Sequence, residues 1–340
     1  MKKTSKIFVA GHRGLVGSAI FRHLKAEGYA NLITRSHAEL DLSDQTAVNA
    51  LIRKEKPEYI FLAAARVGGI MANSTYPADF IRVNLLIQTH IIDAAYRHGV
   101  DRLLFLGSSC IYPRLAPQPM KEEYLLTGPL EPTNSAYAVA KIAGIEMCRS
   151  YNRQHGTSFL PVMPTNLYGP NDNFDLMTSH ALPAFIRKFH LAKMAAEGNR
   201  EAIAKDEDCF GTIPADIRES LSVNNSRVIL WGTGQPKREF LYADDLADAC
   251  VWLMNNYGES DLINIGTGED KSIRELAEIA KAVVGFKGDL VFDSSKPDGM
   301  PQKLLDVSKL NALGWQAETS VEDGVRKTYQ WYLNKLACSL

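Results

Sequence analysis

Three side chains that can reduce a carbonyl group occur in the first half of the chain. Tyr137 and Lys141 stand at i and i+4 of a predicted helix, so both lie on one helix face. Ser108 lies at the C-terminal end of the strand-like run DRLLFLGSS, and open α/β sheets hold their ligands at such strand ends. Tyrosine can give a proton to the carbonyl oxygen, lysine favours the phenolate and can bind a ribose, and serine polarises the same oxygen. Because exposed Tyr and Lys often share this spacing by accident, their position after a serine-bearing strand is what indicates catalysis.

A thiol and an imidazole offer a second kind of chemistry. Cys110 follows Ser108 closely, and His180 stands at the start of a predicted helix. A ketone acidifies the hydrogens on its neighbouring carbons, so one group can remove such a hydrogen while the other reprotonates the opposite face. Both residues also have a structural interpretation, since cysteine is often buried and histidine often only satisfies a core hydrogen bond. The residues alone leave these alternatives open.

A glycine loop follows the first apolar run. Gly11, Gly14 and Gly17 form G-x-x-G-x-x-G between the strand-like segment 6–10 and the helical segment 15–27. Such a loop permits a tight turn and turns a helix N-terminus toward a pyrophosphate. The whole loop is therefore predicted to bind a dinucleotide: Gly11, His12, Arg13, Gly14, Leu15, Val16 and Gly17.

The end of the second predicted strand bears on the choice of dinucleotide. It reads Thr-Arg-Ser-His up to His37, where NAD sites usually place an acid. Arg35 and Arg13 favour the additional 2′-phosphate of NADP, although both also fit solvated surface arginines. Asp41 and Leu42 come too late to bind the ribose and are expected beside the adenine ring.

Strand-like and helical segments alternate along the first 160 residues or so. The predicted strands are 6–10, 31–35, 59–65, 101–109 and 158–166, with helices between them. This alternation predicts an α/β fold with a doubly wound parallel Rossmann sheet. We expect 1–166 with a returning segment 228–266 to form it, and 167–227 with 267–340 to form a smaller C-terminal α/β substrate-binding lobe. The polar stretch 195–227 is expected to be an insertion or mobile lid.

Composition excludes several classes of protein. The chain of 340 residues has 38 basic and 39 acidic side chains, a net charge of −1 that argues against a nucleic-acid partner. Five cysteines without a C-x-x-C pair argue against disulfides and a zinc site, so we expect no metal and a reducing, cytoplasmic location. No apolar run approaches the length of a membrane span.

The glycine loop, the serine and Y-x-x-x-K in this order resemble the extended short-chain dehydrogenase/reductase family. Its dehydratases carry an Asp-Glu pair after the serine or threonine, whereas this chain has a thiol there. The segments GHRGLVGSA, AARVGGIMANSTYPADF, LGSSCIYP, EPTNSAYAVAKIAG, PTNLYGPNDNF and SKPDGMPQKLLDVSKL resemble the branch that makes GDP-L-fucose. This implies a GDP-sugar substrate, GDP-4-keto-6-deoxy-D-mannose, epimerised at C3 and C5 and then reduced at C4 by NADPH.

The resemblance also implies roles for individual residues. Ser108, Tyr137 and Lys141 serve the reduction, and Cys110 and His180 the epimerisations. The nicotinamide half of the cofactor is expected beside Leu106, Gly107, Ser108, Ser109, Lys141, Pro164, Thr165, Asn166, Leu167 and His180. The GDP-sugar is expected to contact Lys188, Trp231, Arg238 and Asp298. The family typically forms homodimers through the helices that correspond to 77–98 and 135–154. The alternatives are a nucleotide-sugar 4-epimerase or another reductase of the family, and a non-catalytic dinucleotide-sensing regulator.

Overall fold

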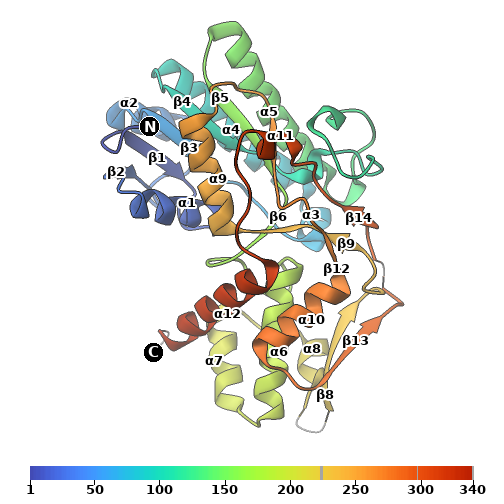
Figure 1. The fold of residues 1–340 in the computed structure, drawn as a ribbon. Coiled ribbons are helices and arrows are strands. Elements are labelled where there is room, and N and C mark those ends of the chain that lie inside the picture. The colour runs from blue at the N-terminus through green and yellow to red at the C-terminus, as the bar shows by residue number, and fades with distance from the viewer. Residues whose placement is uncertain (223–224, 297, 339–340) are drawn as a thin grey trace. The chain divides into compact units, whose positions relative to one another are not determined.

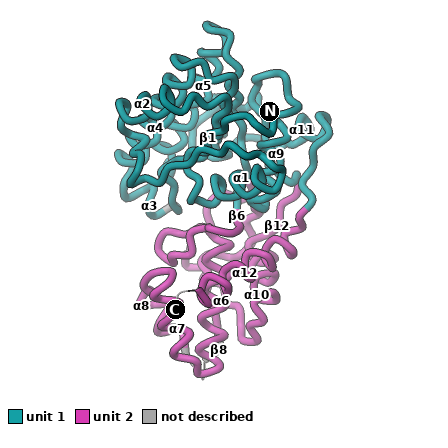
Figure 2. Tube along the Cα trace, turned by 90° about the vertical axis from the view of Figure 1, so that its left-hand side faces the viewer, with its two compact units in different colours: residues 1–167, 241–268, 305–318 teal, residues 168–240, 269–304, 319–340 magenta. Residues whose placement is uncertain are grey.

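The computed structural model describes residues 1–222, 225–296 and 298–338 and divides the chain into two compact units (Figure 2). Unit 1 comprises Met1–Leu167, Leu241–Gly268 and Leu305–Glu318, and unit 2 comprises Tyr168–Phe240, Glu269–Leu304 and Thr319–Leu340.

Two segments differ from the predicted boundaries. The return to the Rossmann part begins at Leu241 rather than at 228, because strand β8 (Asn225–Trp231) pairs with β13 (Asp289–Asp293) inside unit 2. Segment Leu305–Glu318, expected in the lobe, belongs to unit 1, because Leu310 and Trp315 are buried in its core.

The centre of unit 1 is a six-stranded sheet in the order β11-β5-β4-β3-β1-β2 (Figure 1). All of its described pairings are parallel. The strands are β1 (Lys6–Ala10), β2 (Asn31–Ile33), β3 (Tyr59–Leu62), β4 (Arg102–Leu106), β5 (Phe159–Pro164) and β11 (Ile263–Ile265). The order changes direction between β1 and β3, which is where doubly wound sheets bind nucleotides. The predicted fold class is confirmed.

Alternate residues of β1 enter the two cores of unit 1. Ile7 and Val9 pack with helices α1 and α9 on one face, and Phe8 and Ala10 with helices α2, α4 and α5 on the other. This burial on both faces explains why the strands read as continuous apolar runs. The helices of unit 1 are α1 (Leu15–Ala26), α2 (Gln45–Glu55), α3 (Ile70–Thr75), α4 (Pro77–Arg97), α5 (Ser135–His155), α9 (Ala243–Asn256), α11 (Ser308–Ala312) and the 3₁₀ turns η1 (Ser109–Ile111), η2 (Glu122–Tyr124) and η3 (Pro132–Asn134).

Unit 2 is built from helices around short sheets. Its helices are α6 (Ala181–Ala196), α7 (Arg200–Phe210), α8 (Ala215–Ser220), α10 (Ile273–Val284) and α12 (Val321–Ala337). Strand β8 lies between β13 and β7 (Leu221–Ser222), and β9 (Lys237–Arg238) between β12 (Lys271–Ser272) and β14 (Gln302–Lys303). Strands β6 (Asn166–Tyr168) and β10 (Phe240–Tyr242) form a separate two-stranded sheet. Helix α10 begins with a capping box between Ser272 and Glu275, which fixes its first turn.

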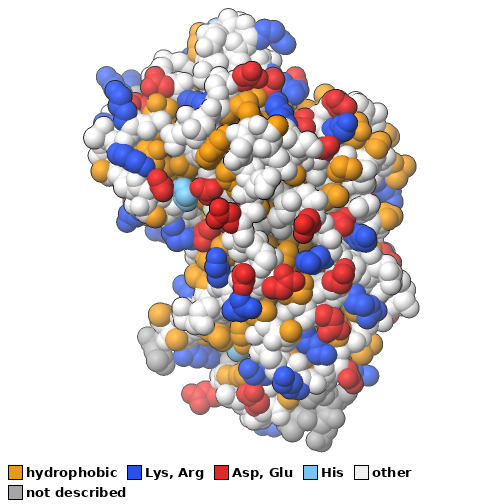
Figure 3. Space-filling model, viewed as in Figure 1, with side chains coloured by type: hydrophobic (Ala, Val, Ile, Leu, Met, Phe, Trp, Pro, Cys, Tyr) orange, Lys and Arg blue, Asp and Glu red, His pale blue; other side chains and the backbone are white. Residues whose placement is uncertain are grey.

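Basic and acidic side chains are interspersed over the face drawn in Figure 3, as expected for a solvated surface with almost balanced charge. In the described part of the chain, none of the helices has both the length and the apolar character that a bilayer crossing requires.

Candidate active site

The three residues predicted for reduction lie together in unit 1. Ser108 follows β4 and caps η1, where its hydroxyl accepts a 3.5 Å hydrogen bond from the Cys110 amide. Ser108 is also a hydrogen-bond partner of the Tyr137 phenol. Lys141 donates a 2.8 Å bond from Nζ to the carbonyl of Leu106, and its Nζ lies 5.8 Å from the centre of the Tyr137 ring. Helix α5 therefore brings the phenol and the ammonium to the carboxyl end of β4.

Burial sets the protonation of this group. It raises the pKa of Tyr137, with Cys110 acting in the same direction and the Ser108 hydrogen bond against it. It lowers the pKa of Lys141 to about 8, while Cys110 opposes the change. The phenol is therefore protonated at neutral pH, as a proton donor must be. The expected preference for the phenolate does not prevail, because desolvation is the largest influence on Tyr137.

Cys110 belongs to the same group. Its thiol is free and the side chain is 9% exposed. The shifts at Tyr137 and Lys141 both include a contribution from Cys110, so the sulfur lies within electrostatic range of both. The structure thus brings a free thiol into the Ser-Tyr-Lys group, as the sequence predicts.

A buried amide supports the helix from behind, and the sequence interpretation missed it. Gln88 of α4 donates a 2.6 Å bond to the carbonyl of Ala140, next to Lys141. At Gly144, one turn further along α5, a Cβ would lie 2.3 Å from the Phe105 ring. This close approach fixes α5 against β4. A glutamine among the apolar residues of α4 is the signal that could have indicated the contact.

The glycine loop has the shape that a pyrophosphate needs. Gly11 has φ +88°, and a Cβ on Gly17 would lie 2.1 Å from the Gly11 carbonyl oxygen. Helix α1 begins after Gly14 without a side-chain cap. Its first-turn amides are therefore uncapped by any side chain, which suits a dinucleotide phosphate. The residues present fit the predicted cofactor.

The two arginines predicted for the 2′-phosphate have different surroundings. Arg13 is exposed, whereas Arg35 forms a 2.7 Å ion pair with Glu55. Glu39 accepts hydrogen bonds from the backbone and hydroxyl of Ser36, and its pKa is lowered chiefly by them and slightly by both arginines. The sequence interpretation missed the carboxylates of Glu55 and Glu39. A bound 2′-phosphate would have to share the two arginines with them. Asp41 accepts from the amide and hydroxyl of Ser43, and His37 contributes slightly to its lowered pKa.

The residues predicted near the nicotinamide come from two neighbouring strand ends. In the segment from Leu106 to Ser109, the Gly107 amide donates a 2.8 Å hydrogen bond to the Val162 carbonyl. In the segment from Pro164 to Leu167, which includes Asn166, the Thr165 amide donates a 3.0 Å hydrogen bond to the Ile265 carbonyl. Both segments thus lie at the carboxyl edge of the same sheet, since β4 pairs with β5 and β5 with β11.

The remaining predicted residues belong to unit 2. His180 is the N-cap residue of α6 and is exposed on one side, and desolvation by the surrounding protein together with the Lys303 ammonium lowers the pKa of its imidazole, which favours the neutral form. Burial also lowers the pKa of Lys188, against the attraction of Asp216 on α8. Cys110 lies in unit 1, so its pairing with His180 stays a prediction.

Another group of unit 2 contains the other predicted substrate residues. Trp231 is 58% exposed and has the Lys296 ammonium 5.6 Å from a ring centre. Asp298 accepts bonds of 2.6 Å and 2.8 Å from the amide and hydroxyl of Thr233, and its charge partly offsets the lowering of the Arg238 pKa by burial. The structure therefore brings Arg238 and Asp298 together and ties Asp298 to a turn.

The polar segment 195–227 includes two helices. Asp206 of α7 is fully buried and paired with Arg187, so α7 packs against α6 at this residue, and the insertion or lid stays a prediction. Residues 223–224 lie outside the described part of the chain.

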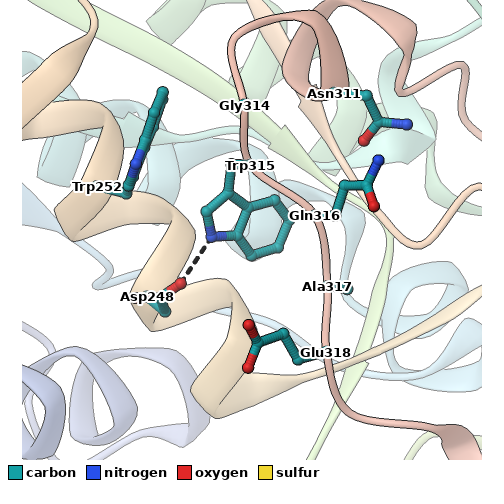
Figure 4. A pocket seen from close by; sticks show the side chains of 8 residues that line it. All are labelled: Asp248, Trp252, Asn311, Gly314, Trp315, Gln316, Ala317 and Glu318. Atoms are coloured by element: carbon teal, nitrogen blue, oxygen red, sulfur yellow. Dashed lines mark hydrogen bonds between the residues drawn. The ribbon is translucent and has the colours of Figure 1, made fainter.

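Figure 4 shows a pocket of unit 1 between α9 and the segment around Trp315. Trp315 donates from Nε1 to Asp248 over 2.7 Å, and none of the predicted site residues lines this pocket. Among residues 1–222, 225–296 and 298–338, no cluster of three or more His, Cys, Asp or Glu side chains could hold a metal ion.

A Rossmann sheet with a glycine loop and a Ser-Tyr-Lys group defines a dinucleotide-dependent enzyme class. Residues 7–266 match the model of the NAD dependent epimerase/dehydratase family, and the chain belongs to this family.

More particular similarities lie within it. The chain is 55% identical to GDP-L-fucose synthase 1 of Arabidopsis thaliana, over 98% of this chain and 95% of that protein. Among solved structures, a GDP-6-OMe-4-keto-L-xylo-heptose reductase from C. jejuni matches with a TM-score of 0.90 and 42% identity, over 98% of this chain and 99% of that one. A GDP-L-fucose synthetase from Naegleria fowleri bound to NADP matches with a TM-score of 0.84 and 29% identity, over 99% and 97%.

Proposed function

We propose that this enzyme converts GDP-4-keto-6-deoxy-D-mannose to GDP-L-fucose by epimerisation at C3 and C5 and reduction at C4. The observation that supports this most is the joint presence of Ser108, Cys110, Tyr137 and Lys141 at one strand end of unit 1. The reductive group and an acid/base thiol stand side by side there. The similarity to a GDP-L-fucose synthase over almost the whole chain supports the same reaction.

In the reduction, the protein supplies the proton. Tyr137 gives its phenolic proton to the C4 carbonyl oxygen as that oxygen becomes negative, and Ser108 donates a hydrogen bond to the same oxygen. Lys141 stabilises the phenolate left behind through its positive charge. NADPH, when bound, supplies the hydride.

In the epimerisation, the C4 ketone acidifies the hydrogens at C3 and C5. We assign Cys110 and His180 as the pair that removes and returns these protons on opposite faces of the ring. The lowered pKa of His180 supports a base role, because a neutral imidazole can accept a proton. The thiol at 110 replaces the acidic pair of the dehydratases, so elimination of water lacks its catalyst.

The cofactor is NADPH. The glycine loop Gly11–Gly17 would hold its pyrophosphate, and Arg13 and Arg35 its 2′-phosphate. Asp41 and Leu42 would border the adenine. The cationic side chains of Lys188 and Arg238 suit the GDP pyrophosphate, and the exposed ring of Trp231 offers a packing surface.

A second candidate function is the reduction of a GDP-4-keto sugar other than GDP-4-keto-6-deoxy-D-mannose. It is favoured by the C. jejuni heptose reductase, which matches this chain with a TM-score of 0.90. Incubation with GDP-4-keto-6-deoxymannose and NADPH, with the loss of NADPH absorbance followed and the product sugar identified, separates the two. Formation of GDP-L-fucose supports the proposal, and no NADPH oxidation with this substrate contradicts it.

We also infer a homodimer and a cytoplasmic location. Tyr96 of α4 and Val139 of α5 are 39% and 44% exposed apolar side chains on the helices that the resemblance assigns to the dimer. All five cysteines are free thiols, which suits a reducing compartment. Light scattering of the purified enzyme tests the dimer.

A further inference from the structure

We propose that Asp206 and Arg187 are positioning residues that hold the loop leading to His180. The inserted helix α7 thereby acts as a fixed support for one half of the acid/base pair. The inference rests on the proposed role of His180 and adds residues to which no role in the reaction has been given above.

Arg187 is the centre of the contact. Its side chain and that of Asp206 are both fully buried, and Nε donates a 2.8 Å bond to Asp206 Oδ1. Nη1 donates to the carbonyl of Phe174 over 3.1 Å and to that of Phe210 over 2.8 Å. Nη2 donates to the carbonyl of Gly211. One guanidinium thus joins helix α6, the end of α7 and the loop before His180.

Helix α12 completes the arrangement. The hydroxyl of Tyr332 donates to Asp206 Oδ2, so both carboxylate oxygens have a partner. The Phe174 ring lies 5.4 Å from that of Phe210 and 5.0 Å from that of Tyr332. The loop is therefore held at Phe174 by its carbonyl and by its ring.

Hydrogen bonds within the loop connect the segment at Phe174 to the residues just before His180. Asp175 Oδ1 accepts from the amides of Met177 and Thr178 at 3.1 Å and 3.0 Å. Asn173 donates a 2.9 Å bond to the Thr178 hydroxyl. His180 follows directly as the cap of α6, the helix that also bears Arg187 and Lys188. A catalytic group displaced by as little as 1 Å can lose about a hundredfold in rate.

A buried ion pair by itself is weak support for a functional role, because such pairs often contribute little net stability. The distinguishing feature here is where the remaining donors of Arg187 point. A pair that only stabilised α7 would not need to bond the Phe174 carbonyl, which lies in the loop and not in a helix.

The test compares Asp206→Asn and Tyr332→Phe with Arg218→Gln. Arg218 of α8 forms an exposed ion pair with Glu207 of α7, the residue next to Asp206, so this variant is a control that removes a surface contact of α7 and leaves the buried one. Asp206, Arg187 and Tyr332 are called the brace, and Asp206→Asn and Tyr332→Phe the brace variants. We expect both brace variants to slow solvent deuterium exchange at C3 and C5 of the keto sugar by about tenfold to a hundredfold, with NADPH affinity unchanged. The control should exchange at the wild-type rate.

Amide hydrogen exchange gives a readout that does not need turnover. Residues 172–182 should exchange faster in the two brace variants and not in the control. If the full-length wild-type enzyme did not act on the keto sugar, the proposed function would fail, while this protection pattern would still test the brace. The inference would be overturned if the two brace variants lost thermal stability but kept the wild-type rate of amide hydrogen exchange in residues 172–182 and the wild-type kcat. Should Asp206→Asn not fold, Tyr332→Phe, which keeps the ion pair and the ring, decides the question alone.

Discussion

The ammonium of Lys141 donates a 2.8 Å hydrogen bond to the carbonyl oxygen of Leu106, the last residue of β4. This contact holds the lysine at the strand end, and burial there lowers its pKa to about 8. Lysine is positive below its pKa and neutral above it. The stabilisation of the Tyr137 phenolate should therefore be present below about pH 8 and be lost above it.

We expect kcat/KM for NADPH oxidation to decline on the alkaline side with a midpoint near pH 8, because this parameter reports groups of the free enzyme. Initial rates from pH 6 to pH 10 check this. Lys141→Met should be slow throughout and lack this decline. A wild-type profile that stays flat to pH 10 would contradict the assignment.

Replacing Tyr137 by phenylalanine removes the proton donor and keeps the ring, whose centre lies 6.4 Å from that of Phe80. NADPH oxidation should fall by about 10²–10⁴-fold, the range of general acid catalysis. Deuterium exchange at C3 and C5 should persist, because it uses other groups. Following both signals on one sample separates the steps, and loss of both would mean that the phenol serves more than the reduction.

Cys110→Ser should have the opposite effect. Exchange at C3 and C5 should decrease by about a hundredfold or more, while NADPH binding is retained, because serine is a far weaker base than a thiolate. Cys338→Ser, at an exposed cysteine, is the control. Normal exchange in Cys110→Ser would remove this residue from the epimerisation.

Gly17→Ala should impair cofactor binding. The added Cβ would lie 2.1 Å from the Gly11 carbonyl oxygen, so the loop must shift, at a cost of about 1–3 kcal/mol. NADPH affinity, measured by calorimetry, should fall by about tenfold or more. Gly258→Ala is a suitable control, because nothing lies within 4 Å of its Cβ position. Equal affinities in the two variants would argue against the loop as the pyrophosphate site.

Asp172 should make the stability of the protein depend on pH. Burial raises the pKa of this carboxyl to about 7, although the Asn173 amide opposes the shift. Its Oδ2 is buried without a partner among the described residues. Because the pKa of Asp172 is higher in the folded state than in the unfolded state, protonation of this carboxyl stabilises the fold. This stabilisation is fully present below about pH 4 and is lost as the pH rises through 7.

Asp172→Asn should therefore gain stability relative to wild type between pH 4 and pH 8, on the order of 2 kcal/mol for a half-buried carboxyl. Urea unfolding at several pH values measures the difference. Asp208→Asn, at an exposed position of α7, is the surface control for the same substitution. A constant difference between Asp172→Asn and wild type would refute this account of Asp172.

The fold was predictable because its strands and helices are local patterns. Segment 6–10 coincides with β1, segment 15–27 exceeds α1 by one residue, and the glycine loop stands where β1 meets α1. Tyr137 and Lys141 were recognisable because a single helix sets their spacing. Ser108 was recognisable because a strand end sets its place.

The contacts that sequence patterns missed depend on partners far apart in the chain. Glu55 meets Arg35 only through the packing of α2 beside β2, and no local spacing reveals it. Helix α7 was expected in an insertion or lid because its buried residue is Asp206, a carboxylate, at a position where a buried helix face usually carries an apolar side chain. A polar residue whose burial is satisfied by Arg187 and Tyr332 looks like surface until the tertiary structure is known.

The position of β11 has a consequence for synthesis on the ribosome. Strand β5 is complete in the chain long before Ile263–Ile265, its neighbour on the outer side, has been made. Until then β5 is an open, apolar edge that could pair with another nascent chain. The residues of unit 2 from Tyr168 to Phe240 are translated during this interval, so the rate at which they emerge sets how long the growing polypeptide is at risk of aggregation.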